Sequence, residues 1–360
     1  MGFEETIDKY SRIIDSRLNS LFNQKISSSE GFLKTSYSYL KEFVLGGGKR
    51  IRPILTIMAY KAVCNHDEEK IYLPAVGIEL FHNSSLIHDD IMDEDSERRG
   101  LLSMHKNFEQ RYLKDHQEFE YKGEIFNEMS KRFGVSMAIL QGNILYALTE
   151  KCFANSQFEN DQVRHTLDII NETYRLINEG QMLDILLEKK IRMTDVDYLT
   201  MIEAKTASLF KTAVEVGATL GQAGENQLET LKHYAMNTGI AFQLQDDLID
   251  ISPGRKGHAL GSDIRKGKSV LLIKKALRKL DKDQQVALSE VWGNEEADQE
   301  SIQAAIGILH RTGAVDEIKQ LAEEKIIEGK SVLEKADLFK EAQEFFISFS
   351  DFMLSRDIHD

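Results

Sequence analysis

Apolar residues return about once per helical turn along most of the chain, with polar residues between them. Ile7, Tyr10, Ile14 and Leu18 follow this spacing and predict a helix over 4–22. The same period predicts further helices over 162–188, 196–221, 226–251 and 268–281. No run of alternating β-type residues and no Asn-Gly hairpin signal is found. The pattern therefore predicts an all-α protein.

Two segments interrupt the helical pattern. Residues 252–263 form a glycine-rich stretch with a proline, which predicts a loop. Residues 105–132 are highly charged with scattered aromatics, and we expect a surface excursion that is part helix and part loop. The C-terminal region 294–360 resembles a set of shorter amphipathic helices. Since no Pro-, Gly- or Ser-rich linker divides the chain, we predict a single domain over 1–360.

Composition narrows the classes of function. The 360 residues are 42% hydrophobic, which is enough for a large core, and the net charge of −14 argues against a nucleic-acid partner. No stretch approaches the ~18 apolar residues of a membrane span, so no integral membrane association is expected. The two cysteines, Cys64 and Cys152, have no disulfide or metal-site spacing, which suits the reducing cytoplasm.

Two acidic motifs carry the candidate chemistry. Residues 88–95 read HDDIMDED and residues 245–250 read QDDLID, so the spacing Asp-Asp-x-x-Asp occurs twice. Helical geometry places each motif in a polar stripe. The stripes consist of His82, Ser85, Asp89 and Asp93 in one helix and Gly239, Gln243, Asp246, Asp247 and Asp250 in the other.

The alternative interpretation of each stripe is a solvated acidic face. Both stripes, however, are embedded in apolar helices with few cations on the same face, and buried carboxylates need a cation. Oxygen-only ligands at this density favour Mg²⁺, held together with waters and substrate phosphates. The two motifs therefore predict a magnesium-dependent site.

Cations gather near the acidic motifs in this acidic chain. Residues 46–53 read GGGKRIRP, in which Lys49, Arg50 and Arg52 follow three glycines and could clamp an anion. The segment lacks the Lys-Ser/Thr ending of a P-loop, and it could also be a flexible turn before a helix that begins near Pro53. Further cationic candidates are Arg98, Arg99, Lys205, Lys266 and Lys268, of which Lys266 is interpreted as a solvated loop lysine. Together the charges predict a metal-bridged diphosphate site.

Six motifs in order resemble the trans-isoprenyl diphosphate synthases, or polyprenyl synthetases, in particular archaeal-type geranylgeranyl diphosphate synthases. They are GGGKRIRP, ELFHNSSLIHDDIMDEDSERRG, EGQMLD, KTASLF, FQLQDDLIDI and GSDIRKGKS, and they extend from about Gly46 to about Ile273. The resemblance implies the isoprenoid synthase fold, a bundle of long, mostly antiparallel helices around a deep central cavity. It also implies condensation of isopentenyl diphosphate with dimethylallyl, geranyl or farnesyl diphosphate.

The family's functional residues can be placed on this chain through the motifs. The resemblance implies two or three Mg²⁺ ions at Asp89, Asp93 and Asp246, with Asp90, Asp247 and Asp250 completing the charge pattern. It assigns isopentenyl diphosphate to Lys49, Arg52, His82 and Arg99. It assigns the allylic substrate to Arg98, Lys205, Thr206, Gln243 and Lys268, with Thr206 and Gln243 also offering oxygens to the developing cation. Gln181 and Asp184 are supporting candidates, and His82 could instead be an ordinary core histidine.

The chain departs from the family pattern at three places. A lysine common before the GSD triplet is replaced by Ala259, and Lys256 or His258 could substitute for it. A usual Gly-Asp pair reads Gly142-Asn143. The 105–132 segment is longer than usual and follows LLSMH instead of a Pro-Thr-x-His connection. None of these departures removes a predicted metal ligand.

Product length in this family depends on the depth of the tunnel below the first acidic motif. Ser84 and Ser85 are small, so the tunnel is expected to stay open there and to end at Phe81. This predicts a C20 product, geranylgeranyl diphosphate, with C25 as the next possibility. The family also implies a homodimer, with the helix around 130–150 as a candidate contact surface.

Three other functions remain to be weighed. A non-catalytic subunit of a heteromeric prenyl synthase usually loses an acidic motif, whereas this chain keeps both. A class I terpene cyclase usually carries an Asn/Ser/Glu metal motif in place of QDDLID. A helical bundle with two redox metals needs Glu-x-x-His pairs, and none lies near the acidic stripes. The prenyl synthase hypothesis is therefore preferred.

Overall fold

The computed structural model describes residues 2–117, 120–188, 194–252, 260–268 and 270–355. The chain divides into two compact units: one comprises the residues up to Tyr60 together with Asn65–Leu167, and the other comprises Lys61–Cys64 and the residues from Asp168 onward. Whether they form one domain, as predicted, stays a prediction. Within the described ranges, no helix is both long and apolar enough to cross a membrane.

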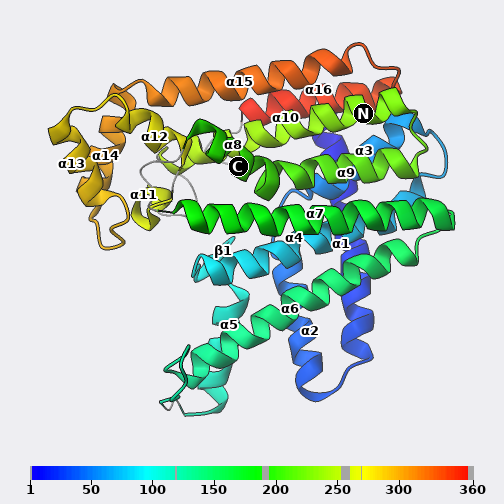
Figure 1. Cartoon of the computed structure of the whole chain (residues 1–360). Coiled ribbons are helices and arrows are strands. Elements are labelled where there is room, and N and C mark those ends of the chain that lie inside the picture. Colours follow the sequence, from blue (N-terminus) through cyan, green and yellow to red (C-terminus); the bar gives the residue numbers. More distant parts are fainter. Residues whose placement is uncertain (1, 118–119, 189–193, 253–259, 269, 356–360) are drawn as a thin grey trace. The chain divides into compact units, whose positions relative to one another are not determined.

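In its described residues, the first unit consists mainly of helices, with one small hairpin (Figure 1). Its elements are α1 (Phe3–Ser27), α2 (Gly31–Leu45), most of α3 (Ile51–Val63), the 3₁₀ turn η1 (Glu68–Ile71), α4 (Tyr72–Met92), β1 (Glu97–Arg98), β2 (Leu101–Leu102), α5 (Met104–Asp115), α6 (Met129–Ala154) and the start of α7 (Asn160–Leu187). Helix α4 is buried over most of its length and packs along α6. It therefore supplies the core of this unit, and its last turns carry the first acidic motif.

The second unit continues from α7. Its other elements are α8 (Asp195–Ile202), the π-helical turn η2 (Glu203–Ala207), α9 (Ser208–Leu220), α10 (Glu225–Asp250), α11 (Ser262–Lys266), α12 (Leu271–Leu277), α13 (Lys282–Val291), α14 (Gln299–Arg311), α15 (Ala314–Leu333) and α16 (Lys340–Leu354). Helix α10 packs against α9, α15 and α16, and the last two run beside it in orange and red (Figure 1). The second acidic motif thus ends a helix that its neighbours hold on several sides.

The spacing of apolar residues predicted α1 correctly. Of the predicted positions, Tyr10, Ile14 and Leu18 are at most 1% exposed, whereas Ile7 is half-buried, and Phe22 continues the buried row at 0%. This spacing keeps one face of the helix against α2 and α4. The pattern predicted one continuous helix over 196–221, but the π-helical turn Glu203–Ala207 separates α8 from α9. The pattern for 268–281 was too long, because Gly267 ends α11 with a left-handed backbone and Val270 is extended.

The expectation of no hairpin was wrong at one place. Strands β1 and β2 pair antiparallel, with Glu97 opposite Leu102 and Arg98 opposite Leu101. The turn residues Arg99 and Gly100 have φ values of 54° and 74°, as in a type I′ turn. Strands of two residues are too short to show alternation, so this hairpin left no pattern. It directs Arg98 and Arg99 back toward the end of α4.

The 105–132 segment agrees with its prediction where the structure describes it, whereas the predicted loop at 252–263 is wrong at its end, because α11 begins at Ser262. The 105–132 segment contains most of α5, an isolated bridge between Glu120 and Glu128, and the start of α6. Most of the predicted loop at 252–263 lies outside the described residues, as do Lys256, His258 and Ala259.

Candidate functional site

The first acidic motif lies at the end of α4, and its neighbouring aspartates differ in burial. Asp89 is half-buried, with 22% of its side chain exposed, and Asp93 is half-buried one turn further on. Asp90 is fully buried. Successive residues on a helix point about 100° apart, so Asp90 faces Arg98 and the interior while Asp89 and Asp93 remain partly exposed.

Asp90 is held by an arginine from the hairpin. The Nε of Arg98 donates to Oδ1 of Asp90 at 2.5 Å, and Nη2 of Arg98 lies 3.5 Å from Oδ2 of Asp89. Burial raises the pKa of Asp90 to about 7, while Arg98 opposes the shift. This arrangement gives Asp90 a role in holding Arg98 beside Asp89. Its predicted role as a metal ligand stays a prediction.

A cationic cluster forms on the other side of the hairpin. The Nη1 of Arg52 lies 3.1 Å from Nε2 of His82, and Nη1 of Arg99 donates to the carbonyl oxygen of Gly47 at 2.9 Å. Burial lowers the pKa of His82 well below its usual value, and Arg52 and Arg99 lower it further. His82 is therefore neutral, and the arginines supply the positive charge. Lys49, at the start of the same segment, is exposed.

Arg50 does not belong to the anion clamp in which its sequence position had placed it. It is 3% exposed, and its Nε and Nη1 donate to Asp15 at 2.7 Å and Glu79 at 2.8 Å. Asn83 also donates to Glu79, at 3.1 Å. The three-cation hypothesis was therefore wrong for Arg50, because a buried carboxylate on α4 binds its guanidinium. Asp15 lies outside the quoted motifs, and Glu79, the first residue of the motif that contains HDDIMDED, was not singled out as a partner of Arg50.

The second acidic motif, at the end of α10, shows the same division. Asp246 is half-buried, whereas Asp247 and Asp250 are each 4% exposed. Oδ2 of Asp250 accepts a hydrogen bond from the backbone nitrogen of Asp263 at 3.1 Å, which ties α10 to α11. Burial raises the pKa of Asp263 well above its usual value, and Asp250 raises it further. In both motifs the first aspartate of the pair is thus the more accessible one.

Asp247 lies in a hydrogen-bonded chain that the motifs did not reveal. The hydroxyl of Tyr198 donates to Oδ2 of Asp247, and Nε2 of Gln243 donates to Oδ1 at 3.0 Å. The hydroxyl of Thr206 in turn donates to Oε1 of Gln243 at 2.9 Å. Burial raises the pKa of Asp247 to about 7, and the bonds from Tyr198 and Gln243 oppose the shift. The predicted pair Thr206 and Gln243 is therefore brought together.

Two of the predicted lysines share one carboxylate. Nζ of Lys205 donates to Oδ2 of Asp184 at 2.6 Å, and Nζ of Lys268 lies 3.5 Å from the same oxygen. Burial raises the pKa of Asp184, but the two lysines outweigh it and the pKa is lowered. Lys268 also pairs with Glu188 at 3.1 Å, a residue one turn beyond Asp184 that carried no motif. Gln181 is buried one turn before Asp184.

The π-helical turn presents Lys205 and Thr206, and two glycines hold it closely. A Cβ at Gly180 of α7 would collide with the backbone of Lys205. A Cβ at Gly239 of α10 would lie 2.7 Å from Cα of Ala207. Since any larger residue would separate these backbones, the two glycines bring the turn close to both helices. Such turns occur frequently at functional sites.

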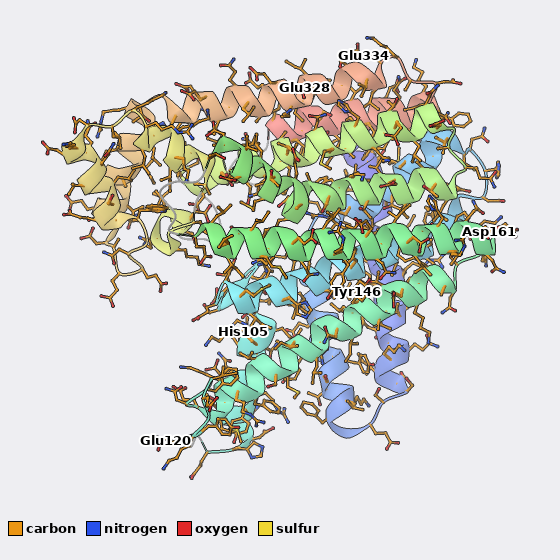
Figure 2. All side chains as sticks on the ribbon, in the orientation of Figure 1. His105, Glu120, Tyr146, Asp161, Glu328 and Glu334 are labelled. Atoms are coloured by element: carbon orange, nitrogen blue, oxygen red, sulfur yellow. The ribbon has the colours of Figure 1, made fainter. Side chains whose placement is uncertain are left out.

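The residues predicted to set product length have different surroundings. Phe81 is fully buried and packs edge-on against Tyr146 of α6, with ring centroids 5.8 Å apart. Tyr146 is labelled on α6 in Figure 2. Ser84 is also fully buried, and its hydroxyl donates to the carbonyl oxygen of Gly142 on α6 at 2.8 Å. Ser85 is half-buried and bonds to its own helix at His82. Phe81 and Ser84 therefore face α6, whereas Ser85 does not.

The carboxylates suit a hard divalent ion that brings other ligands with it. Among the residues that the structure describes, no three His, Cys, Asp or Glu side chains lie close enough together to hold a metal alone. Mg²⁺ commonly uses one or two carboxylates and completes its shell with water and substrate phosphates. Asp89 and Asp93, one turn apart on the open face of α4, offer such a set, as does Asp246 on α10.

Comparison with known proteins agrees with the geometry. The family described as polyprenyl synthetase matches residues 33–309. The geranylgeranyl diphosphate synthase of Methanosarcina mazei is 33% identical over 89% of this chain and 90% of its own. The crystal structure of geranylgeranyl pyrophosphate synthetase from Pyrococcus horikoshii is similar with a TM-score of 0.82 and 29% identity, covering 99% of this chain and 100% of its own.

A second similar solved structure contains bound ligands. The crystal structure of geranylgeranyl pyrophosphate synthase from Corynebacterium glutamicum, complexed with isoprenyl diphosphate and magnesium, has a TM-score of 0.87 and 25% identity, and the match covers 98% of this chain and 99% of that one. The predicted all-α isoprenoid synthase fold and the family resemblance are confirmed. The chain belongs to the polyprenyl synthetase family of prenyltransferases.

Proposed function

We propose that this chain condenses isopentenyl diphosphate head-to-tail, in a 1'-4 linkage, with an allylic diphosphate to make geranylgeranyl diphosphate (C20). The observation that carries the proposal is the division within both acidic motifs. Asp89 and Asp246 are accessible, while Asp90 and Asp247 are held inside by protein donors. Arg98 lies beside the first motif, and Lys205 adjoins Thr206, which bonds to Gln243 next to the second motif. The name of the Methanosarcina mazei relative supports the C20 product.

Mg²⁺ is the cofactor that these carboxylates would hold, at Asp89, Asp93 and Asp246, as two or three ions. Asp90 and Asp250 complete the proposed metal set through their charge. When bound, the metal neutralises the charge that develops on the leaving diphosphate. The protein's part is to hold the carboxylates in place, and the buried bonds of Asp90 and Asp250 do this.

The cationic side chains bind the two diphosphates. In the proposed site, the diphosphate of isopentenyl diphosphate contacts Lys49, Arg52, His82 and Arg99. The family motifs assign the allylic diphosphate to Arg98, Lys205 and Lys268. Each arginine can offer two parallel N–H donors to phosphate oxygens. Neutral His82 adds a directional hydrogen bond and no charge.

The reaction follows from this placement. The C–O bond of the allylic diphosphate breaks and leaves positive charge on the allyl group. The oxygens of Thr206 and Gln243 stabilise this charge. The double bond of isopentenyl diphosphate supplies the electron pair for the new C–C bond. A proton then leaves to the released diphosphate, and a new allylic double bond forms.

Incubation of the purified protein with Mg²⁺ and labelled isopentenyl diphosphate tests the proposal directly. Dimethylallyl, geranyl and farnesyl diphosphates serve in turn as primers, and the products are separated by chromatography. We expect chain extension that ends at C20 and that a chelator abolishes. A cyclic hydrocarbon would instead indicate a terpene cyclase, and no turnover with any primer would indicate a non-catalytic subunit.

Product length is expected to respond to the residues of α4 that face α6. We expect Phe81→Ala to lengthen the product toward C25, because it removes the proposed floor. Ser84→Phe should shorten the product toward C15 and should lower stability by about 1–3 kcal/mol through overpacking. Ser84→Ala is the matched control, since it removes the bond to Gly142 without adding volume. If neither Phe81→Ala nor Ser84→Phe alters the product distribution, the floor of the tunnel lies elsewhere.

We also propose that the chain forms a homodimer in the cytoplasm. Ile139 and Leu140 on α6 are 44% and 52% exposed, which supports a contact surface on the helix around 130–150. The buried free cysteines Cys64 and Cys152 suit a reducing compartment. Sedimentation should give twice the chain mass of 41.1 kDa, and a species of the single mass would exclude the dimer.

A further inference from the structure

A four-residue hydrogen-bonded chain connects the buried interior of the second unit to the oxygens proposed to face the substrate. It begins at Tyr198 on α8, which is 1% exposed, and continues through Asp247 and Gln243 on α10 to Thr206 on η2. Tyr198 and Asp247 are 49 residues apart in sequence. Three elements therefore converge on one amide group.

The hydrogen bonds of this network determine which end of the Gln243 amide faces which neighbour. A glutamine amide can rotate so that its oxygen and its NH₂ group exchange places, and its hydrogen-bond partners decide between the two orientations. A carboxylate only accepts, so Asp247 draws the NH₂ group of Gln243 to itself at 3.0 Å. The amide oxygen then points to the hydroxyl of Thr206 at 2.9 Å.

Tyr198 in turn determines how Asp247 is held. Its hydroxyl donates to Oδ2 and leaves Oδ1 for Gln243. With both oxygens engaged by donors inside the protein, and only 4% of the residue exposed, Asp247 has a fixed rotamer. Gly239, one turn before Gln243, brings the backbone of Ala207 close and thereby keeps Thr206 within reach.

We infer that Tyr198 and Asp247 are positioning residues that lock the Gln243 amide with its oxygen, not its NH₂ group, on the side of Thr206 and the reacting carbon. This inference rests on the proposed function. A reversed amide would place partial positive charge next to the developing allylic cation and would raise the barrier to ionisation. Asp247 then serves the chemistry without binding the metal, in contrast to Asp246 beside it.

The test compares Tyr198→Phe and Asp247→Asn with the wild type in steady-state assays over a range of Mg²⁺ concentrations. We expect kcat to fall about 10-fold for Tyr198→Phe and about 100-fold for Asp247→Asn, because these residues act through Gln243 and their loss should not exceed the roughly 10²–10³-fold effect of removing a direct transition-state hydrogen bond. The KM of each substrate and the Mg²⁺ concentration for half-maximal activity should stay within about twofold, because the cationic and metal-binding groups remain.

Tyr234→Phe is the matched control. Tyr234 is also buried in the second unit, and its hydroxyl donates to the carbonyl oxygen of Phe346 at 2.6 Å, on the N-terminal half of α10. This variant should lower the melting temperature without lowering kcat. An unchanged kcat in Tyr198→Phe would overturn the inference, as would a shift in the Mg²⁺ requirement of Asp247→Asn as large as that of Asp246→Asn.

A readout without substrate separates the network from the proposed function. The double variant Tyr198→Phe/Asp247→Asn should lose less in melting temperature than the sum of the losses of the two single variants, because both substitutions remove the same hydrogen bond. Additive losses would contradict the network even if the enzyme is active. Conversely, an inactive wild-type protein with non-additive losses would contradict the proposed function and leave the network in place.

Discussion

Asp246→Asn is expected to lower kcat/KM for chain extension by about 1,000-fold or more. Asparagine keeps the size of the side chain and removes the charge that would hold Mg²⁺, and a 1,000-fold loss corresponds to about 4 kcal/mol of transition-state stabilisation. Asp89→Asn should have a similar effect, since Asp89 is the accessible aspartate of the other pair. Steady-state rates measured against both substrates and Mg²⁺ check this.

Glu94→Gln is the matched control for these variants. Glu94 is exposed and adjoins Asp93, so the substitution removes one negative charge from the same segment without altering a proposed ligand. Its activity should remain within about threefold of the wild type, as expected for a screened surface charge. A loss below tenfold in both Asp246→Asn and Asp89→Asn would contradict the proposed metal sites.

Arg50→Met is expected to have the largest effect on stability, lowering the free energy of unfolding by about 3–5 kcal/mol. The guanidinium of Arg50 is buried between Asp15 and Glu79, and Glu79 is itself 2% exposed. Without Arg50, the Glu79 carboxylate would remain buried without its cation. Urea denaturation followed by circular dichroism measures the loss.

Two further variants test whether the loss of stability comes from the buried ion pair. Glu79→Gln combined with Arg50→Met should recover part of the stability, because it removes the buried charge. Arg12→Met is the control: Arg12 is 83% exposed in its side chain and lies 3.9 Å from Asp8, so its loss should change stability by less than about 0.5 kcal/mol. If Arg50→Met costs no more than Arg12→Met, the buried ion pair does not stabilise the fold.

The sequence could predict which residues share a helical face but not which of two neighbours is buried. The period of four placed Asp89 with Asp93 and gave the buried face of α1. Asp89 and Asp90 are adjacent, and only the tertiary surroundings, which include Arg98 from the hairpin, decide that Asp90 is the buried one. The prediction that Arg50 and Lys49 share an anion clamp was wrong for the same reason, because the sequence does not show that Arg50 is buried and Lys49 exposed.

Contacts between distant segments were also beyond local patterns. Tyr198 bonds to Asp247 across 49 residues, and Arg50 bonds to Glu79 across 29. A tyrosine or a glutamate in an apolar helix gives no sign of its partner. The ordered motifs did group Thr206 with Gln243 and name Asp184 as a supporting candidate, because the family resemblance carries long-range information that periodicity lacks.

The π-helical turn Glu203–Ala207 has a consequence for how this site could arise. A π turn is equivalent to one residue inserted into an α-helix, and each residue of an α-helix advances the direction of the side chain by about 100°. Removing one residue, such as Ala204, would restore regular winding and rotate Lys205 and Thr206 relative to α9. The chemistry of this region thus depends on an irregular residue count, so alignments that close the insertion would place the wrong side chains opposite Gln243.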